Sequence, residues 1–191
     1  MYNLFMMNTQ LISILVTYAT RYGSTREVAE AVAATLGEAG REVDLQPVRK
    51  VRSLEGYSLV VLGAPLYIGR WHKDAHRFLE QQRETLAHKP VAVFALGPLH
   101  EAEDQWRAVR LQLEKELAKY PWLAPAAVEV FGGKYDPAKL RFSDKVLAAA
   151  PASPLYQVPA CDLRDWAAIR TWAAGLAAQA GAPSPQASSP A

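Results

Sequence analysis

Three aliphatic hydroxyl side chains, Thr20, Ser24 and Thr25, lie close together between an apolar run and a helical pattern. With Gly23 and the unpaired amides at the start of a helix, they suit a phosphate group, because hydroxyls and amides donate hydrogen bonds to its oxygens. The segment contains neither the Gly-x-Gly-x-x-Gly motif of dinucleotide sites nor the Gly-Lys-Ser/Thr motif of nucleoside triphosphate sites. The pattern therefore predicts a monophosphate site. The plainer interpretation is that Ser24 only caps the helix while the other hydroxyls are solvated.

The histidines and the lone cysteine do not form a recognisable metal or redox motif. His72 and His76 share a helix face, but no glutamate follows His72 and no third ligand is identifiable, so we expect a solvated helix face. His100 follows a strand beside an expected ligand loop, and we expect it to be the catalytic residue that transfers a proton. Cys161 has no partner at the spacing of a disulfide or redox pair, which is typical of a protein from a reducing compartment.

The elements that must position these residues alternate between strands and helices. Short apolar, β-branched runs predict strands, and apolar residues that recur on one helical face predict helices. We expect strands at 11–18, 41–48, 58–64, 90–97 and 126–131, and helices at about 28–36, 72–88, 101–120 and 162–180, the last capped by Asp162. Such alternation requires crossover connections, so it predicts an α/β domain with a doubly wound, five-stranded parallel sheet in three layers. Ligands of such sheets bind outside the carboxyl ends of the strands.

Composition favours one globular domain and excludes several classes of protein. The chain has 191 residues, of which 50% are hydrophobic and 21% are charged, a balance typical of a folded domain. Its apolar runs are far shorter than the roughly twenty residues that cross a bilayer, and residues 1–10 lack a signal-peptide pattern, so we expect a cytoplasmic protein. The net charge of +2 is scattered, which gives no support for nucleic-acid binding. We assign 1–10 to an N-terminal extension, 11–180 to the domain, and 181–191 to a disordered tail.

The segment from Tyr18 to Val32 resembles the phosphate signature of the flavodoxins, which bind flavin mononucleotide (FMN). The matching positions are an aromatic residue, a hydroxyl, a small residue, a threonine, an alanine and an aliphatic residue: Tyr18, Thr20, Gly23, Thr25, Ala29 and Val32. Thr17 departs from the pattern, because it is polar where the family has an apolar residue. The resemblance implies a flavodoxin-like fold with strand order 2-1-3-4-5, FMN as cofactor, and phosphate contacts from Thr20, Arg21, Tyr22, Gly23, Ser24 and Thr25.

An FMN site also needs apolar or aromatic faces for the isoalloxazine ring and backbone groups at its polar edge. After the third strand, Tyr67 and Trp71 are both available to stack on such a ring. The alternative is that these aromatic side chains close the end of the core, an interpretation almost as good for Trp71, whereas Tyr67 lies in mid-loop. We expect ring contacts from Pro65, Leu66, Tyr67, Ile68 and Gly69, and from Gly97, Pro98 and Leu99 after the fourth strand.

Within the flavodoxin-like proteins, the chain resembles the menaquinone-dependent protoporphyrinogen oxidases over roughly residues 11–178. The likeness rests on residues 20–27 and 63–69, on Gly132-Gly133-Lys134-Tyr135 followed by Pro137, Arg141, Phe142 and Asp144, and on Asp165-Trp166. It implies an FMN-dependent oxidoreductase of heme biosynthesis. Such an enzyme takes electrons from protoporphyrinogen IX, or a similar reduced substrate, and passes them to a membrane quinone.

A segment of basic and apolar residues from Lys134 to Leu147 suits an anionic lipid surface or an anionic porphyrin. We expect substrate contact, or peripheral contact with the inner face of a membrane, from Lys134, Tyr135, Lys139, Arg141 and Phe142, and from Trp71. An equally good alternative is a solvated loop and helix whose apolar residues dock on the domain. Where the oxidase group has a longer basic and aromatic insertion, this chain continues into the Ala- and Pro-rich residues 148–154.

Two other functions remain open from the sequence. One is a single-electron carrier, although carriers usually present an acidic face to basic partners and this chain has a pI near 8.7. The other is a non-catalytic module whose loop holds another phosphate or anion. Flavin binding separates the module from the flavoproteins, and activity with a quinone separates the enzyme from the carrier. The patterns predict no particular oligomeric state.

Overall fold

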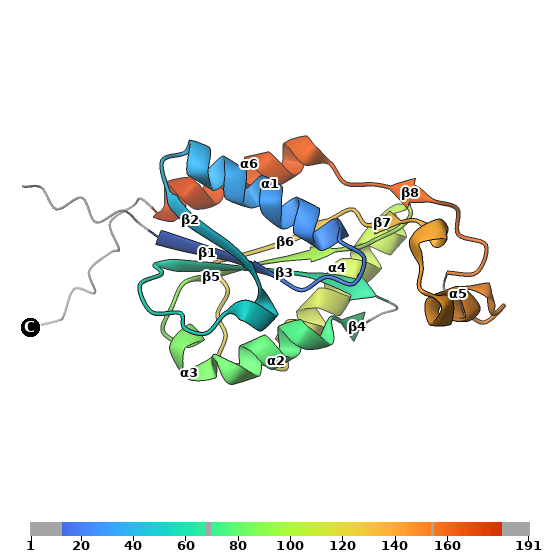
Figure 1. Ribbon diagram of the computed structural model, residues 1–191, viewed down its shortest axis with the longest axis horizontal. Coiled ribbons are helices and arrows are strands. Elements are labelled where there is room, and N and C mark those ends of the chain that lie inside the picture. The colour runs from blue at the N-terminus through green and yellow to red at the C-terminus, as the bar shows by residue number, and fades with distance from the viewer. Residues whose placement is uncertain (1–12, 68–69, 154, 181–191) are drawn as a thin grey trace, which may run out of the picture.

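A computed structural model describes residues 13–67, 70–153 and 155–180, so the expected N-terminal extension, the expected tail, Ile68 and Gly69 lie outside the described residues. Five parallel strands form a sheet in the order β2-β1-β3-β5-β6 (Figure 1). They are β1 (Ser13–Tyr18), β2 (Glu42–Pro47), β3 (Leu59–Tyr67), β5 (Val91–Leu96) and β6 (Ala127–Phe131). Since β5 and β6 are the fourth and fifth predicted strands, the predicted order is confirmed. A short strand, β4 (Arg70–Trp71), pairs antiparallel with the end of β3 and was not predicted.

Helices cover both faces of the sheet, as a doubly wound fold requires. On one face lie α1 (Ser24–Glu38) and α6 (Trp166–Ala180); on the other lie α2 (Lys73–Gln81), α3 (Arg83–Leu86) and α4 (Glu103–Leu117) (Figure 1). Each face has its own core of fully buried side chains, with Val28 and Ile169 in one and Leu79 and Leu113 in the other. The predicted three-layer α/β class is therefore confirmed. In the described ranges, no helix is long and apolar enough to cross a bilayer.

The central strands are buried because their sequences are apolar on both faces. All residues of β5 are buried, and β3 passes so close that a Cβ on Gly63 would lie 2.0 Å from Cζ of Phe94. At one edge of the sheet, β2 carries polar residues at alternate positions and is followed by a short 3-10 turn, η1 (Val48–Lys50). This packing fixes the positions of the strand ends, and therefore of the loops that follow them.

Two predicted helices differ from those in the structure. The helix expected at 72–88 is divided at Gln82, where the backbone leaves the helical range (φ −105°, ψ 14°). The helix expected at 162–180 begins at residue 166, and Asp165 caps it, because its Oδ1 accepts hydrogen bonds from the amides two and three residues later at 2.9 and 3.0 Å. The predicted cap, Asp162, instead lies in the short strand β8 (Cys161–Asp162).

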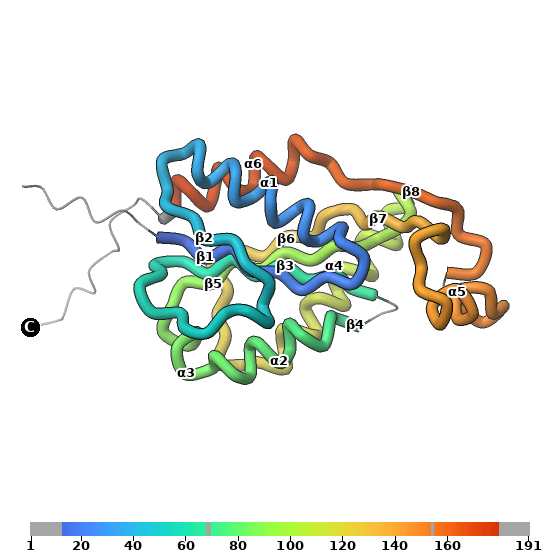
Figure 2. Tube along the Cα trace, in the orientation of Figure 1, coloured from blue at the N-terminus to red at the C-terminus, as the bar shows by residue number. Residues whose placement is uncertain are grey.

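After β6 the chain leaves the sheet at its carboxyl edge and returns only as α6 (Figure 2). We call residues 132–165 the C-terminal excursion. It contains β7 (Lys134–Tyr135), the 3-10 turn η2 (Pro137–Lys139), α5 (Phe142–Ala149) and β8, and β7 pairs antiparallel with β8. Gly132 allows the two ends of the excursion to meet, since a Cβ there would lie 2.0 Å from the carbonyl oxygen of Leu163.

Candidate functional site

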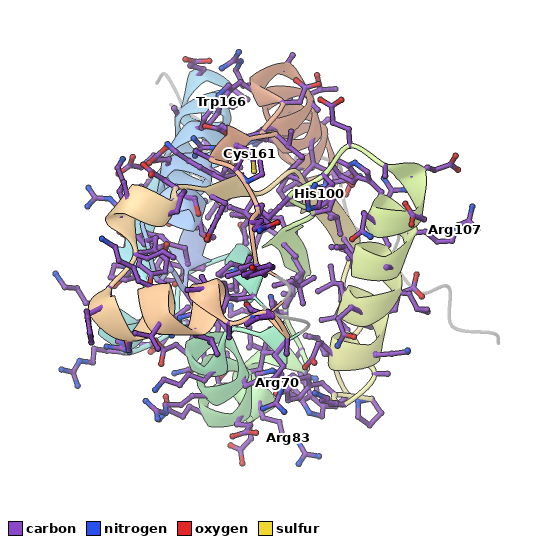
Figure 3. The ribbon with its side chains drawn as sticks, turned by 90° about the vertical axis from the view of Figure 1, so that its right-hand side faces the viewer. Arg70, Arg83, His100, Arg107, Cys161 and Trp166 are labelled. Atoms are coloured by element: carbon purple, nitrogen blue, oxygen red, sulfur yellow. The ribbon has the colours of Figure 1, made fainter. Side chains whose placement is uncertain are left out.

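A cavity of about 250 Å³ lies at the carboxyl edge of the sheet, where the loops after β1, β3 and β5 meet the C-terminal excursion. Figure 3 looks onto this end of the molecule, with α5 in front and His100 near the middle of the view. The structure thus brings together residues of all three loops predicted to hold a ligand: Arg21, Tyr22, Ser24, Pro65, Leu66, Tyr67, Gly97, Pro98 and Leu99. This is the location that a doubly wound sheet offers to a ligand.

The loop after β1 turns sharply into α1. Gly23 has a φ of +92°, a left-handed conformation that glycine adopts without strain, and its amide donates to Oγ1 of Thr20 at 3.0 Å. Gly23 is the N-cap residue of α1, and Ser24 is the first residue of the helix itself. The interpretation of Ser24 as a helix cap is therefore wrong. The first backbone amides of α1 have no acceptor within the helix, and they face the loop.

Thr25 is fully buried, and its Oγ1 has no hydrogen-bond partner among the described residues. A buried hydroxyl without a partner costs roughly 1–3 kcal/mol, so such groups are rare unless a ligand completes them. Thr17, near the end of β1, is buried too, but its Oγ1 donates to the carbonyl oxygen of Gln46 at 2.9 Å. That bond between β1 and β2 explains why a polar residue is tolerated where the flavodoxin pattern has an apolar one. The donors of this loop fit a phosphate group.

Arg21 and Tyr22 point toward α5. The guanidinium of Arg21 donates from Nε and Nη2 to the two carboxylate oxygens of Asp144 at 2.8 and 2.5 Å, and the Tyr22 hydroxyl donates to the same carboxylate. Asp144 is 5% exposed, so this contact closes one side of the loop. Because the arginine is already paired, the loop offers a phosphate mainly neutral donors, as its sequence predicts.

Apolar groups from the loops after β3 and β5 line the rest of the cavity, where a flat ring would lie. Tyr67 is half-buried, its hydroxyl has no partner in the part of the chain that the structure describes, and burial raises the pKa of this phenol. Leu66 and Pro65 lie beside it, and the segment Gly97-Pro98-Leu99 provides the opposite loop. The predicted ring contacts that the structure describes therefore all line the cavity.

Two predicted contact residues are buried in the protein. Trp71 is 3% exposed and packs in the core under α2, with its Nε1 donating to the carbonyl oxygen of Ala64 at 3.3 Å, so it does not fit a role in stacking or in substrate or membrane contact. The pairing of β4 with β3 turns this side chain inward. Tyr135 is 6% exposed and packs with Leu140 and Leu155, so it forms a wall of the cavity rather than an outer surface.

The other residues predicted to contact substrate or membrane lie on the excursion and differ in exposure. Lys134 lines the cavity and pairs with Glu27 at 3.4 Å, whereas Lys139 is two-thirds exposed at the cavity wall. Arg141 is exposed, and the side chain of Phe142 is 84% exposed. The alternative in which the apolar residues of this segment dock on the domain therefore does not hold for Phe142.

The histidines occupy three different environments. His100 is exposed at the cavity wall, within reach of a bound ligand, and its catalytic role remains a prediction. His72 accepts a hydrogen bond from the amide of Asp74 and so caps α2, while His76 lies between Tyr120 and Glu116 at 2.6 and 3.1 Å. The expected solvated helix face is therefore wrong for both. Across residues 13–67, 70–153 and 155–180, no three potential metal ligands of the His, Cys, Asp or Glu type gather.

An ion-pair cluster that the sequence did not predict holds the start of α1. The Arg164 side chain, 2% exposed, donates to Glu27 at 2.7 Å, to Asp162 at 2.6 Å and to the carbonyl oxygen of Ser24 at 3.4 Å. Burial alone would raise the pKa of Glu27, but Arg164 and Lys134 outweigh that effect and lower it. Glu27 and Arg164 are 137 residues apart, so no local spacing connects them.

Comparisons with known proteins agree with this geometry. A family model described as a flavodoxin domain matches residues 15–153. Protoporphyrinogen IX dehydrogenase [quinone] of Escherichia coli strain K12 is 31% identical over 85 residues, which cover 44% of this chain and 47% of that protein. The chain thus matches about half the length of this curated relative.

Solved structures give the same fold. A short-chain flavodoxin associated with a bacterial microcompartment has a TM-score of 0.58 and 18% identity, covering 90% of this chain and 100% of that one. A flavodoxin of Streptococcus pneumoniae has a TM-score of 0.54 and 16% identity, covering 87% and 99% of the two chains. The chain therefore belongs to the flavodoxin domain family, whose cofactor is the flavin mononucleotide that the sequence predicts.

Proposed function

We propose that this protein is an FMN-dependent oxidoreductase that takes hydrogen from protoporphyrinogen IX, or a similar reduced substrate, and reduces a quinone. The observation that carries the proposal is a cavity that joins the loop after β1, at Tyr22 and Ser24, to an apolar chamber lined by Tyr67 and Leu99. In the same loop, the buried Oγ1 of Thr25 has no hydrogen-bond partner among the described residues. The likeness to a protoporphyrinogen IX dehydrogenase [quinone] supports the choice of substrate and acceptor.

In each turnover a pair of electrons and a pair of protons leave the porphyrinogen, and the same numbers convert a quinone to its quinol. FMN, when bound, supplies the redox chemistry. Thr20 and Thr25 would hold the phosphate, Tyr67 and Leu66 would face the ring, and the apolar walls of the cavity would exclude water. His100 stands at the wall, where an imidazole can accept a proton from the substrate.

The charge at the cavity suits an anionic substrate. Lys139 and Lys134 line it with His100; Lys139 lies 3.8 Å from Asp136, which also lines the cavity, and Lys134 lies 3.4 Å from Glu27, whose charge Arg164 also offsets. Carboxylate groups on a reduced porphyrin would therefore meet cationic side chains at a largely apolar chamber.

A membrane quinone requires that the protein reach a lipid surface. Exposed apolar side chains are concentrated on the excursion, where Phe142 is 84%, Val146 59% and Leu147 49% exposed. Arg141 and Lys145 lie among them and are exposed as well. We propose that this face of α5 makes peripheral contact with anionic lipid at the inner face of the membrane, next to the cavity that Lys139 lines.

A single-electron carrier is the second candidate, and the likeness of the fold to flavodoxins favours it. Anaerobic assays separate the two. The FMN-loaded protein is mixed with protoporphyrinogen IX and a quinone, and the fluorescence of the porphyrin product is followed against samples without protein or without quinone. Porphyrin formation that depends on both protein and quinone supports the enzyme. No formation above the protein-free rate contradicts it and favours the carrier.

The proposed role of His100 has its own test in this assay. His100→Gln removes the group that can accept a proton but keeps a polar side chain of similar length. We expect a lower turnover rate. An unchanged turnover rate would remove His100 from the mechanism.

A further inference from the structure

The side chain of Arg21 belongs to the phosphate loop by sequence, but it is turned away from the loop's donors. Its guanidinium forms a two-bond ion pair with Asp144, at 2.8 and 2.5 Å, and the carboxylate also accepts from the Tyr22 hydroxyl. Asp144 lies in the first turn of α5, which is 123 residues further along the chain. Planar, two-bond pairing of this kind fixes the orientation of an arginine as well as its position.

The same guanidinium reaches the ring side of the cavity. Its Cζ lies 5.5 Å from the centre of the Tyr67 ring and 5.8 Å from that of Tyr22, within the range of cation–π attraction. Arg21 therefore touches both the tyrosine expected to face the isoalloxazine ring and Asp144 of α5. In this way Asp144, Arg21 and Tyr67 form a continuous chain of contacts from α5 to the ring side of the cavity.

A contact that pulled the Arg21 guanidinium toward a phosphate and off Asp144 would break this arrangement. Asp144 has a side chain 6% exposed, and moving the arginine away would leave that carboxylate buried without its cation. The neutral donors of Thr20, Thr25 and the start of α1 can hold the phosphate without that loss.

We propose that Arg21 and Asp144 are positioning residues for the flavin ring rather than phosphate ligands: Asp144 holds Arg21, and Arg21 holds Tyr67 against the ring site. The inference rests on the flavin site but not on the identity of the substrate. It also gives α5 a second role, because the helix that carries the exposed Phe142 is directly linked to the residues beside the flavin.

The test compares FMN with riboflavin, which has the ring but lacks the phosphate. Flavin-free protein is titrated with each flavin, and quenching of flavin fluorescence gives both dissociation constants. Arg21→Met should raise both constants by the same factor, about fivefold, so that their ratio stays constant. It should also leave the bound flavin more fluorescent, because Tyr67 is held less firmly against the ring. Merely lowering the stability of the fold would not change the fluorescence of the bound flavin.

Two further variants complete the design. Asp144→Asn should act like Arg21→Met, and the double variant should be no worse than either single variant, because both remove the same contact. Arg26→Met is the matched control: it removes the same charge from the first turns of α1, where Arg26 pairs with Glu30 in solvent at 2.7 Å. It should bind both flavins like the parent chain.

The outcomes are distinct. If Arg21→Met weakens FMN binding at least tenfold more than riboflavin binding, Arg21 is a phosphate ligand and the proposal is overturned. If Arg21→Met binds both flavins with parental affinity and fluorescence, the link has no role and the proposal is also overturned. If Asp144→Asn does not fold, Arg21→Met alone decides. A parent chain that binds neither flavin would overturn the flavin site itself, which no result from the variants alone would do.

Discussion

Replacing Thr25 by valine should move protein stability and cofactor affinity in opposite directions. Valine has nearly the shape of threonine but lacks the hydroxyl, whose oxygen is buried without a partner in the described structure. Without flavin, the substitution removes a buried group that has lost its water. With flavin, it removes a donor to the phosphate.

The sizes of both effects follow from this position. Relief of an unpaired buried hydroxyl should raise the free energy of unfolding of the flavin-free protein by about 1–2 kcal/mol. Loss of a hydrogen bond to a charged group costs roughly 1.5–3 kcal/mol, so the dissociation constant of FMN should rise by about 10- to 100-fold. Riboflavin lacks the phosphate, and its binding should not change.

Urea denaturation followed by circular dichroism gives the stability, and flavin fluorescence titrations give the affinities. Thr17→Val is the control for stability, because its buried hydroxyl donates to Gln46 and its loss should destabilise the protein by about 1 kcal/mol. Thr35→Val is the control for affinity, since Thr35 lies on the same helix and bonds to Ala31 at 3.0 Å. A Thr25→Val chain that is less stable than the parent and binds FMN equally well would refute the assignment of the phosphate loop.

Three other predictions concern the fold and the surface. Gly63→Ala should destabilise the protein by about 3 kcal/mol or more in urea denaturation, because its Cβ would overlap the buried Phe94 ring, and parental stability would contradict the packing of β3 on β5. Burial lowers the pKa of His76 below its usual 6.5, so the unfolded chain takes up the proton first and the free energy of unfolding should fall as the pH drops below 6.5. His76→Gln should flatten that pH dependence, and an equal slope in both chains would contradict the prediction. Phe142→Ser should reduce co-sedimentation of the protein with anionic vesicles, whereas Leu111→Ser, on the exposed side of α4, should not. If both variants lose vesicle binding equally, or neither does, α5 is ordinary surface.

The sheet and the FMN cofactor could be predicted because their sequence signals are local, whereas the assignment of the phosphate loop's residues stays a prediction. Apolar runs such as 90–97 can be buried on both faces only inside a parallel sheet, and the loop donors lie within six consecutive residues, Thr20 to Thr25. The structure also distinguishes the fully buried Thr25 from the partly exposed Ser24. The residue types alone could not show that difference. The choice between Tyr67 and Trp71 depended on a short strand, β4, whose pairing turns the tryptophan into the core.

The contacts around the site could not be predicted because they join distant parts of the chain. Asp144 matched a family pattern, but nothing in its neighbourhood indicated a partner at Arg21. Arg164 pairs with Glu27 across a similar separation, and His76 meets Glu116 on another helix. Each pair depends on where the excursion or the helices pack, which is a property of the tertiary fold and leaves no periodic pattern in the sequence.

The proposed function requires that electrons from a reduced porphyrin reach a quinone through FMN bound in this cavity. The most direct measurement is the visible absorption of the FMN-loaded protein under anaerobic conditions, first on addition of protoporphyrinogen IX and then on addition of a quinone. We predict that the oxidised flavin band disappears with the first addition, as porphyrin forms, and returns with the second. A band that persists with protoporphyrinogen, yet disappears with a chemical reductant, would contradict the account.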